Sequence, residues 1–441
     1  MLLLLAIVFL AVIHLSICIF YIQRNLIRQS QRFHTLNNWL EVSAQANVNF
    51  WVLVPLFKET ELAKTTVNRF YSELKEIQNL KIIFITHYSD QPTSAIVKEA
   101  LSSLENRENF IHLISTRIKS LKSEQLNFAL DWIDSALRDC DFVSVYDCDS
   151  VPDARAFQFL SNYLVLNNIN QEQMIAFQQS PYYPLKEGNI SVEIIATSRN
   201  IHSLNYHYTA EITSYFRTEN FNPLRMAIHL TGHGEHIKFS ALKHAGGFSP
   251  PSCDSSLGFA LSYRNIPIVS IPIPDTSPSP SKIFDMYMQG LRWYNGCNLY
   301  IQELNNVKPT LRVYTNALLS FVNNLRWFLI TPLCLIAAIS ILILAIIKKS
   351  NYYLAYILIL VIVTLFRHFL LFYAYQQLHD FAKPKVNTVL PNLWSWMTKY
   401  FLCYLVMRLI WSIPPWHYYV LQFLNKNVVI TSTPKSKNYF S

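Results

Sequence analysis

The segment Phe142-Val143-Ser144-Val145-Tyr146-Asp147-Cys148-Asp149 joins an apolar, β-rich run to two aspartates one residue apart. The run predicts a buried strand, and side chains two residues apart on an extended chain lie on one face. Asp147 and Asp149 therefore converge if the extended geometry continues. Paired carboxylates suit hard divalent cations, and Mg²⁺ typically takes one or two of them together with substrate phosphates. An Asp-rich surface turn is the alternative interpretation of the motif alone.

Similar apolar runs alternate with helical patterns between residues 50 and 310. This alternation predicts an α/β domain with a largely parallel sheet. The predicted strands are Phe50–Val54, Lys81–Thr86, Ile111–Ile114, Phe142–Tyr146 and Met174–Gln178. The predicted helices include Leu62–Gln78 and Glu124–Ala136.

The composition indicates a membrane protein. Of the 441 residues, 51% are hydrophobic and 15% are charged, and the charged share is well below the roughly 25% that is usual in soluble domains. The net charge of +9 fits a membrane-surface protein that handles phosphorylated substrates, because no Lys/Arg run resembles a nucleic-acid patch. The seven cysteines form no C-x-x-C pair, which disfavours a zinc site or a disulfide framework and fits a reducing, cytosolic face.

An apolar segment at residues 1–22 is long enough to span a bilayer. It has neither a basic start nor a small-x-small cleavage site, so a retained transmembrane anchor is favoured over a signal peptide. Arg24, Arg28 and Arg32 follow it and place the next segment in the cytosol by the positive-inside rule. Residues 23–49 are expected to be a juxtamembrane linker.

Residues 326–424 return to an apolar composition and precede a short tail, 425–441. The candidate spans are Trp327–Ile347, Tyr352–Phe366, interrupted by Arg367 and His368, and Phe401–Leu424, which contains Arg408 and Pro414-Pro415. The basic tail favours the cytosolic side by the positive-inside rule. A helical hairpin with an interfacial or re-entrant segment would place the tail there, whereas three full spans would not. The tryptophans expected at the membrane interface are Trp394, Trp396, Trp411 and Trp416.

Two further segments place polar groups at the ends of predicted elements. Val54-Pro55-Leu56-Phe57-Lys58-Glu59 closes the first predicted strand, and ligands of open α/β sheets bind outside such strand ends. An ordinary connecting loop has the same composition. Lys122 opens a predicted helix, where the dipole also favours an anion, although a solvated lysine beside a Ser123 cap is the simpler interpretation.

Two downstream segments add a carboxylate and a guanidinium. Asp254 lies in a Ser-rich segment, where a lone Asp is most often a cap or a turn residue. Gln289 and Arg292 share a face of the helix predicted from Ile283 to Leu304. Arg292 suits bidentate phosphate binding, and Trp293 offers a flat apolar surface. Taken alone, this helix is better explained as an amphipathic interface helix whose Arg reaches lipid headgroups.

In their order along the chain, these segments resemble the membrane glycosyltransferases of family 2, such as cellulose, chitin-oligomer and hyaluronan synthases and ceramide glucosyltransferase. The resemblance covers about residues 50–310 and extends loosely to the flanking apolar segments. The matching order is V-P-x-x-x-E, K-x-x-x-L-N, D-x-D, an aspartate in an E-D-like position and Q-x-x-R-W. Each motif is weak alone, and the ordered set of five is much more specific.

The resemblance implies a GT-A-like, mostly parallel nucleotide-sugar-binding sheet. One N-terminal and two to three C-terminal transmembrane helices would flank it. The glycosyltransferase domain would be cytosolic and span residues 50–282, followed by an interface helix at 283–310 that carries the Q-x-x-R-W motif. The chain would be a multi-pass integral protein of the plasma (inner) membrane.

The resemblance also implies roles for individual residues. Asp149, helped by Asp147, would hold Mg²⁺ or Mn²⁺ on the diphosphate, and Asp254 would be the general base on the acceptor hydroxyl. The expected nucleotide-sugar-binding residues are Pro55, Glu59, Lys122, Asp147, Gln289, Arg292 and Trp293. The segment Gly232-His233-Gly234-Glu235 falls where the family lines its acceptor pocket.

Two positions depart from the family pattern. Thr86 or His87 stands where the family often has an Asp that contacts the base, so uracil specificity does not carry over directly. Cys253 stands where a Glu usually precedes the base aspartate, so different acceptor contacts are expected.

The expected reaction is an inverting, metal-dependent transfer from a nucleotide-sugar, with a UDP-sugar as the expected donor, to a lipid or saccharide acceptor at the membrane. Few spans favour a single transfer or short oligomers. One rival is a phosphatase of the haloacid dehalogenase type, because Asp147-Cys148-Asp149-Ser150-Val151 fits D-x-D-x-[TV], but that fold places the motif at its first strand. The other rival interpretations are a non-catalytic membrane scaffold, a pseudo-glycosyltransferase and a transporter. No nucleic-acid partner is expected.

Overall fold

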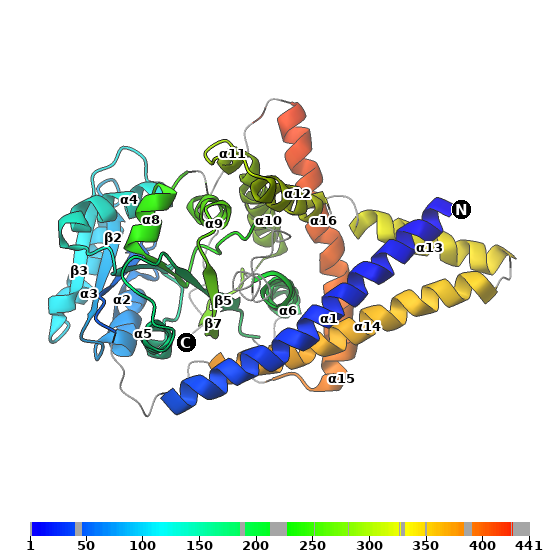
Figure 1. Ribbon diagram of the computed structural model, residues 1–441, viewed down its shortest axis with the longest axis horizontal. Coiled ribbons are helices and arrows are strands. Elements are labelled where there is room, and N and C mark those ends of the chain that lie inside the picture. The colour runs from blue at the N-terminus through cyan, green and yellow to red at the C-terminus, as the bar shows by residue number, and fades with distance from the viewer. Residues whose placement is uncertain are drawn as a thin grey trace.

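The computed structural model describes residues 2–39, 46–185, 190–211, 227–250, 252–280, 282–325, 327, 331–348, 351–382, 390–424 and 426. Seven strands form one sheet in the order β3-β2-β1-β4-β6-β5-β7 (Figure 1). Strand β6 is antiparallel to both of its neighbours, and the other pairs are parallel. The strands are β1 Phe50–Pro55, β2 Leu80–His87, β3 Phe110–Ser115, β4 Phe142–Val145, β5 Ala176–Tyr182, β6 Glu235–Lys238 and β7 Ile268–Thr276.

Helices cover both faces of the sheet, and the central strand β1 is apolar at every position. In β1, Phe50, Val52 and Val54 belong to the core on one face, and Trp51 and Leu53 belong to the core on the other. Helices α2 Ala63–Leu74, α3 Gln91–Ser102 and α5 Ala154–Leu166 cover the first face. Helices α4 Lys122–Ile133, α8 Phe239–Ala245 and α9 Cys253–Tyr263 cover the second.

The predicted α/β class and the mostly parallel sheet are confirmed. The first four predicted strands agree with β1 to β4 within one residue at each end. The fifth begins two residues later than predicted and continues to Tyr182, and helix α2 ends at Leu74 instead of Gln78. Strands β6 and β7 were not among the predicted strands. Strand β6 has only four residues, and β7 carries Pro272 and Pro274, which an edge strand tolerates.

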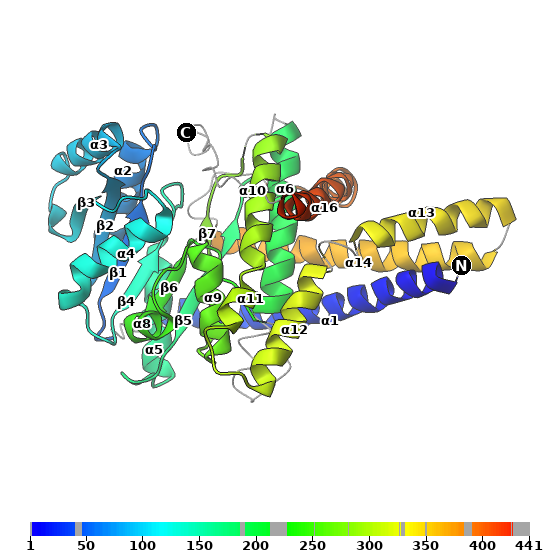
Figure 2. The ribbon, with the colours of Figure 1, turned by 90° about the horizontal axis from the view of Figure 1, so that it is seen from above.

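Three long helices extend away from the sheet as a bundle: α1 Leu2–Trp39, α13 Thr331–Lys348 and α14 Asn351–Ala382 (Figure 2). Among the described residues, the segments 5–38 and 351–382 are long and apolar enough to cross a membrane. Helix α14 continues through Arg367 and His368, which interrupt the apolar candidate span Tyr352–Phe366, and the Arg367 side chain donates to Oδ1 of Asn205 at 2.7 Å. The adjacent His368 pairs with the carbonyl of Trp396 at 3.0 Å.

Helix α1 extends beyond the predicted anchor at 1–22 and includes most of the predicted linker at 23–49. Its second half packs on the domain. The Asn25 amide donates to the Tyr208 carbonyl at 2.6 Å, and Arg32 donates to the Ser270 carbonyl at 3.0 Å. The orientation of the bundle relative to the sheet is therefore fixed by hydrogen bonds as well as by apolar packing.

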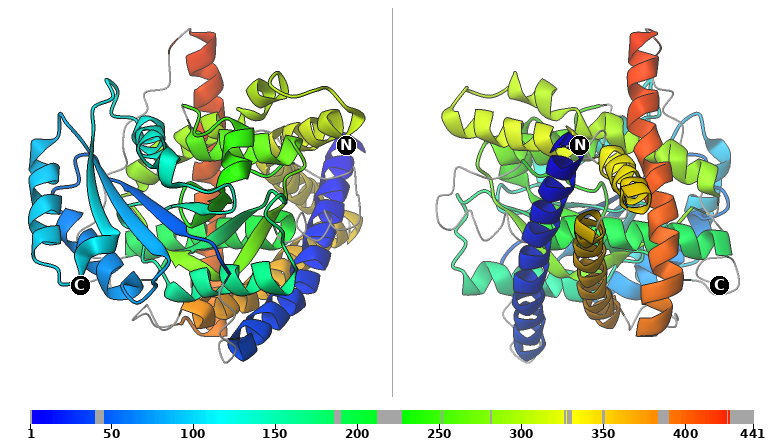
Figure 3. Two further views of the ribbon diagram at one scale, coloured as in Figure 1. Left: turned by 60° about the vertical axis from the view of Figure 1, so that its left-hand side comes forward. Right: turned by 90° about the vertical axis from the view of Figure 1, so that its right-hand side faces the viewer.

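A second group of helices consists of α6 Ile190–Tyr206, α10 Ile283–Cys297, α11 Tyr300–Leu304, α12 Leu311–Leu325, α15 Leu393–Ser395 and α16 Phe401–Phe423. Figure 2 shows α6, α10 and α16 between the sheet and the bundle, and in the right-hand view of Figure 3 the orange-to-red helix α16 runs along the height of the molecule. The single helix predicted over Ile283–Leu304 is two helices, because the chain turns at Asn298 and Leu299. Helix α16 continues through Pro414 and Pro415. The tail at 425–441 lies, apart from Lys426, outside the described residues.

The tryptophans predicted at a membrane interface divide into two pairs. Trp394 and Trp416 are exposed. Trp396 and Trp411 are buried in the helical core, so the interfacial assignment is wrong for these two. Trp396 stacks on His368, and Trp411 stacks on Trp327, which shows that contacts between helices determine their positions.

Candidate functional site

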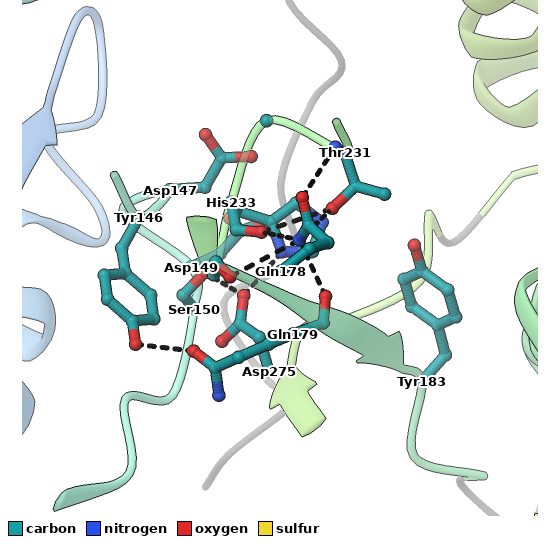
Figure 4. Close-up of polar contacts among 12 residues, drawn as sticks. Tyr146, Asp147, Asp149, Ser150, Gln178, Gln179, Tyr183, Thr231, His233 and Asp275 are labelled. Carbon is teal, nitrogen blue, oxygen red and sulfur yellow. Dashed lines mark hydrogen bonds and ion pairs between the residues drawn. The ribbon is translucent and has the colours of Figure 1, made fainter. Parts of the chain in front are cut away.

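Asp147 and Asp149 lie just beyond the carboxyl end of β4, where the chain turns at Cys148 and Asp149 instead of staying extended. Hydrogen bonds to the backbone carbonyls hold this turn. Thr66 donates to the Cys148 carbonyl at 2.6 Å, and the Ser150 amide donates to the Asp147 carbonyl at 3.1 Å. Because the extended geometry ends here, the two carboxylates do not share a strand face, and Figure 4 shows Asp147 pointing away from His233 and Asp275. Strand β4, at whose end the motif lies, is the fourth strand in the chain, unlike the phosphatase arrangement.

Lys122 joins three segments at this edge of the sheet. It is the first residue of α4, and its ammonium donates to Oδ1 of Asp147 at 2.7 Å and to the Gly232 carbonyl at 2.5 Å. Burial alone would lower the pKa of Lys122, but the charges of Asp147 and Asp254 outweigh it and raise the pKa. The lysine is thus a permanent cation between the two predicted carboxylates.

Asp254 lies in the first turn of α9, and its Oδ1 accepts a hydrogen bond from Ser252 at 2.7 Å. The turn presses against the loop before β6. A Cβ atom on Gly232 would lie 2.8 Å from Oδ2 of Asp254, and Gly232 has a φ of +85°. Glycine is required there for both its conformation and this close approach. The loop therefore holds Asp254 near Lys122.

Helix α10 brings the predicted Q-x-x-R-W residues toward the same edge. The Arg292 guanidinium lies within electrostatic range of Asp147 and Asp254; burial lowers its pKa, and the two carboxylates oppose this shift. Trp293 packs edge-on against Trp411, with ring centroids 5.6 Å apart. Gln289 has a buried Oε1 with no hydrogen-bond partner in the described part of the chain.

Pro55 is the last residue of β1, and Glu59 lies in the loop that follows it. The Glu59 carbonyl accepts from the amides of Leu62 and Ala63, and the Glu59 amide donates to Oγ1 of Thr93 at 3.1 Å. These backbone bonds organise the start of α2. The structure thus places both residues at the predicted sheet edge, where Glu59 helps to form the loop.

The end of β2 differs from the family pattern in its bonding as well as in its sequence. Thr86 pairs with His112 at 2.9 Å, and Nε2 of His87 lies 2.8 Å from the Arg117 carbonyl. Asp90, three residues further on, caps α3 and accepts from the Lys58 amide at 2.5 Å. Both candidate base-contacting residues are therefore engaged in the folding of the loop.

Two groups were not among the predicted site residues. Nδ1 of His233 lies 2.5 Å from Oδ2 of Asp275, and the Ser150 hydroxyl donates to the same oxygen at 2.8 Å (Figure 4). Burial alone would lower the pKa of His233, but the hydrogen bond and charge of Asp275 raise it. This buried pair supports the turn that carries Asp149. The Gly232–Glu235 segment was the only sequence signal for it, since Asp275 lies in an unpredicted strand.

Glu235 opens β6 and pairs in register with Val145 of β4 and Gln178 of β5. Its side chain is fully buried, and neither carboxyl oxygen has a hydrogen-bond partner within the described residues. Burial raises the pKa of Glu235 to about 8, although nearby Lys122 opposes this shift. The group therefore carries its proton at neutral pH.

The carboxylate oxygens at this sheet edge suit a divalent-cation site whose coordination is completed only by a bound ligand. The described residues contain no cluster of three His, Cys, Asp or Glu side chains that could hold a metal by themselves. Asp147, with a side chain 33% exposed, and the half-buried Asp149 supply hard oxygen atoms. Two carboxylates fit Mg²⁺ or Mn²⁺ when substrate phosphates complete the coordination.

No protein-family model matches the sequence, and no curated protein matches it. Among solved structures, a mannosyltransferase of Pyrobaculum calidifontis in complex with GDP-Man and Mn²⁺ aligns with a TM-score of 0.45 and 14% identity, over 85% of this chain and 98% of that one. S. aureus TarS 1-349 in complex with UDP-GlcNAc aligns with a TM-score of 0.42 and 12% identity, over 76% and 89%. Because the identities are 14% and 12% and both TM-scores are below 0.5, these alignments do not establish a function, and the proposal below is argued from the site alone.

Proposed function

We propose that this chain is a glycosyltransferase that moves a sugar from a nucleotide-sugar to a lipid or saccharide acceptor at a membrane, with inversion. The observation that carries the proposal is the approach of four charged side chains from four separate segments. Lys122 comes from α4, Asp147 from the end of β4, Asp254 from α9 and Arg292 from α10. Open α/β sheets bind ligands at the carboxyl ends of their strands, which is where this set lies.

The proposed chemistry is a single displacement at the anomeric carbon. Asp254 accepts the proton of the acceptor hydroxyl as its oxygen bonds to that carbon. The bond from the carbon to the diphosphate oxygen breaks, and the nucleoside diphosphate leaves with the electron pair. Arg292 and Lys122 stabilise the charge that develops on the leaving group. The hydrogen bond from Ser252 keeps the Asp254 carboxylate oriented.

Asp147 and Asp149 are the residues that would hold Mg²⁺ or Mn²⁺. When bound, the cation would neutralise the diphosphate as a Lewis acid. The Lys122 ammonium also contacts the partly exposed Asp147 carboxylate.

The membrane part of the proposal rests on the length and composition of α1 and α14. We place the catalytic domain in the cytosol, because Arg24, Arg28 and Arg32 follow the apolar start of α1. UDP-sugars come first among the donors to be tested. The acceptor would approach from the side of the helical bundle.

The test is a thermal-shift screen of nucleotide-sugars with and without Mn²⁺ or Mg²⁺. A donor at a hundredfold excess over its Kd stabilises the folded state by about 2.7 kcal/mol. We expect metal-dependent stabilisation of the wild type and its loss in Asp147→Asn. Asp139→Asn is the matched control, because Asp139 is an exposed carboxylate of the same sequence context. If no nucleotide-sugar stabilises the wild type with either metal, the proposal is wrong.

A further inference from the structure

Helix α16 contains Pro414 and Pro415 and is nevertheless continuous. Proline has no N–H, so Pro415 cannot donate to the carbonyl of Trp411, four residues before it. The indole N–H of Trp327 donates to this carbonyl at 2.7 Å. Trp411 is 4% exposed, and a buried carbonyl needs a hydrogen-bond partner. A side chain from outside the helix thus replaces the bond that the proline removes.

The same two tryptophans connect this hydrogen bond to α10. The Trp411 ring stacks on the Trp327 ring, with centroids 5.9 Å apart and an interplanar angle of 24°. The Trp411 ring also meets Trp293 of α10 edge-on, at 5.6 Å. The hydrogen bond at the Trp411 carbonyl therefore helps to fix the aromatic group against which Trp293 packs.

Gly290 of α10 lies against the ring of Pro414. A Cβ atom on Gly290 would lie 3.3 Å from Cγ of Pro414 and 3.8 Å from its Cβ. Gly290 is in the interior of a helix, where glycine is less favourable than alanine. Its helical conformation does not require a glycine, whereas the close approach of the proline ring favours one.

Three contacts between the two helices are spaced three residues apart on each helix. They pair Tyr287 with His417, Gly290 with Pro414 and Trp293 with Trp411. Residues three apart share one face of a helix, so this set, called the α10–α16 contact below, occupies one face of α10. Residue numbers rise on α10 as they fall on α16, so the two helices run in opposite senses through the contact.

Arg292 lies on the other side of α10. It follows Gly290 by two residues, which places it on the opposite face of a helix with about 3.6 residues per turn. Its guanidinium lies within electrostatic range of Asp147 and Asp254. A rotation of α10, or a change in its distance from α16, would therefore move Arg292 relative to these two carboxylates.

We propose that the α10–α16 contact positions Arg292 for sugar transfer, and that Pro414, Pro415 and Trp327 are positioning residues. Pro414 sets how closely α10 approaches α16. Pro415 leaves the Trp411 carbonyl free, and Trp327 binds this carbonyl and keeps the tryptophans together. The contact itself stands on its geometry, and its role in transfer rests on the proposed function.

The first experiment exchanges size across the contact in the full-length chain. Gly290→Ala adds a methyl group against Pro414, and Pro414→Ala removes the ring atom that this methyl group would meet. The double variant has room for the methyl group. The readouts are kcat, the donor KM, the hydrogen exchange of residues 283–297 and the Tm.

Gly290→Ala should lower kcat by about tenfold, because a displacement of about 1 Å can cost a hundredfold and a few tenths of an ångström are at stake here. The donor KM should change less, because Arg292 acts on charge that develops as the diphosphate leaves. Exchange over residues 283–297 should become faster, and the double variant should return both kcat and exchange towards the wild type. A merely structural contact would lower the Tm and leave kcat per folded molecule unchanged.

The second experiment tests the Trp411 carbonyl by a double-mutant cycle on the Tm. Trp327→Phe keeps a ring and removes the N–H donor, so it should lower the Tm by about 2–4 °C. Pro415→Ala supplies a backbone N–H to the same carbonyl, so most of this loss should disappear in the double variant. Trp132→Phe is the control, because Trp132 is half exposed on α4, and its Tm should equal that of the wild type.

Wild-type kcat and exchange in Gly290→Ala would overturn the proposal. A lowered kcat that Pro414→Ala does not restore would also overturn it, because the added methyl group would then act elsewhere. If Gly290→Ala does not fold, a folded double variant supports the contact, and failure of both variants to fold overturns it. Additive Tm changes in the second experiment would remove Trp327 and Pro415 from the proposal.

A wild type that transfers no sugar would end the proposed function but not the test of the contact. Hydrogen exchange of residues 283–297 then decides alone. Faster exchange in Gly290→Ala that Pro414→Ala reverses would uphold the contact and count against the proposed function only. Unchanged exchange in Gly290→Ala would overturn the contact as well.

Discussion

Strand β4 has the same tripeptide at both of its ends: Asp139-Cys140-Asp141 precedes it, and Asp147-Cys148-Asp149 follows it. In the first, the buried Asp141 carboxylate accepts from the Asn49 amide at 2.8 Å and from Arg138 through the backbone and the guanidinium. In the second, the chain fixes the carbonyls through Thr66 and Arg69 and leaves part of the Asp147 side chain exposed.

The two ends of β6 repeat this difference. Lys238, paired with Phe142 beside the first triplet, donates to three backbone carbonyls at 2.8 to 2.9 Å. Glu235, paired with Val145 beside the second, buries both carboxyl oxygens without a hydrogen-bond partner in the described residues. At the amino end of β4 the fold therefore satisfies its own polar groups. At the carboxyl end, within the described residues, it leaves the buried Glu235 carboxyl without a hydrogen-bond partner and part of the Asp147 side chain exposed.

The largest expected effect is on transfer by Asp254→Asn, at the carboxyl end. Loss of a general base should lower the rate about a hundredfold to ten-thousandfold. Donor binding should survive, because Asn keeps the shape of the side chain. Steady-state rates and donor affinity check this, with Asp139→Asn as the matched control at the other end. Full turnover by Asp254→Asn would remove the proposed base.

The next effect concerns the pH dependence of stability and Glu235. Between pH 4.5 and about 8 the folded state keeps a proton on Glu235 that the unfolded chain has lost. Stability should therefore fall as pH rises through this window, by up to about 5 kcal/mol for this group. Glu235→Gln should flatten that slope. Denaturant unfolding at a series of pH values measures it, and identical slopes in the two proteins would contradict the buried proton.

Asp141→Ala should act on stability and not on transfer. Removal of the buried carboxylate leaves the half-buried Asn49 amide and the Arg138 guanidinium without their acceptor, so the free energy of unfolding should fall by about 2–3 kcal/mol. Transfer per folded molecule should stay at the wild-type value. Urea unfolding and rates measured on the folded fraction test both parts. A lost activity with unchanged stability would reverse the contrast between the two ends.

The smallest effect belongs to the pair of Lys243 and Asp139 beside the first triplet. Both side chains are more than half exposed, at 52% and 67%. Lys243→Ala should therefore change the free energy of unfolding by less than about 1 kcal/mol, and added salt should reduce the difference. A loss as large as that in Asp141→Ala would show that exposure is not what separates Asp139 from Asp141.

The sequence predicted the parts of the fold that depend on local pattern. The apolar runs of β1, β2 and β4 are recognisable because nearly all of their side chains are buried, and β3 is recognisable from its shorter apolar run. Strand β6 was missed because Glu235, His236 and Lys238 are polar, and their burial depends on partners from other segments. Strand β7 was missed because its prolines suit only an edge position, which a sequence pattern does not reveal.

The site divides in the same way. Lys122, Asp147, Asp254 and Arg292 were named from motif order, and the structure brings them together, while their chemical roles remain proposals. Asp275 belongs to no motif, because its properties arise from burial and from neighbours far along the chain.

The insertion of β6 between β4 and β5 also sets an order of events during synthesis. The register joins Val145 to Glu235, ninety residues later. At the usual ~5–20 residues per second, the nascent chain would carry β4 with one unpaired edge for roughly 5–18 seconds. An exposed edge can pair with other chains, and a short strand limits that risk. The shortness of β4, which has four residues with a serine at the third, thus limits pairing with other chains during synthesis as well as fitting the complete sheet.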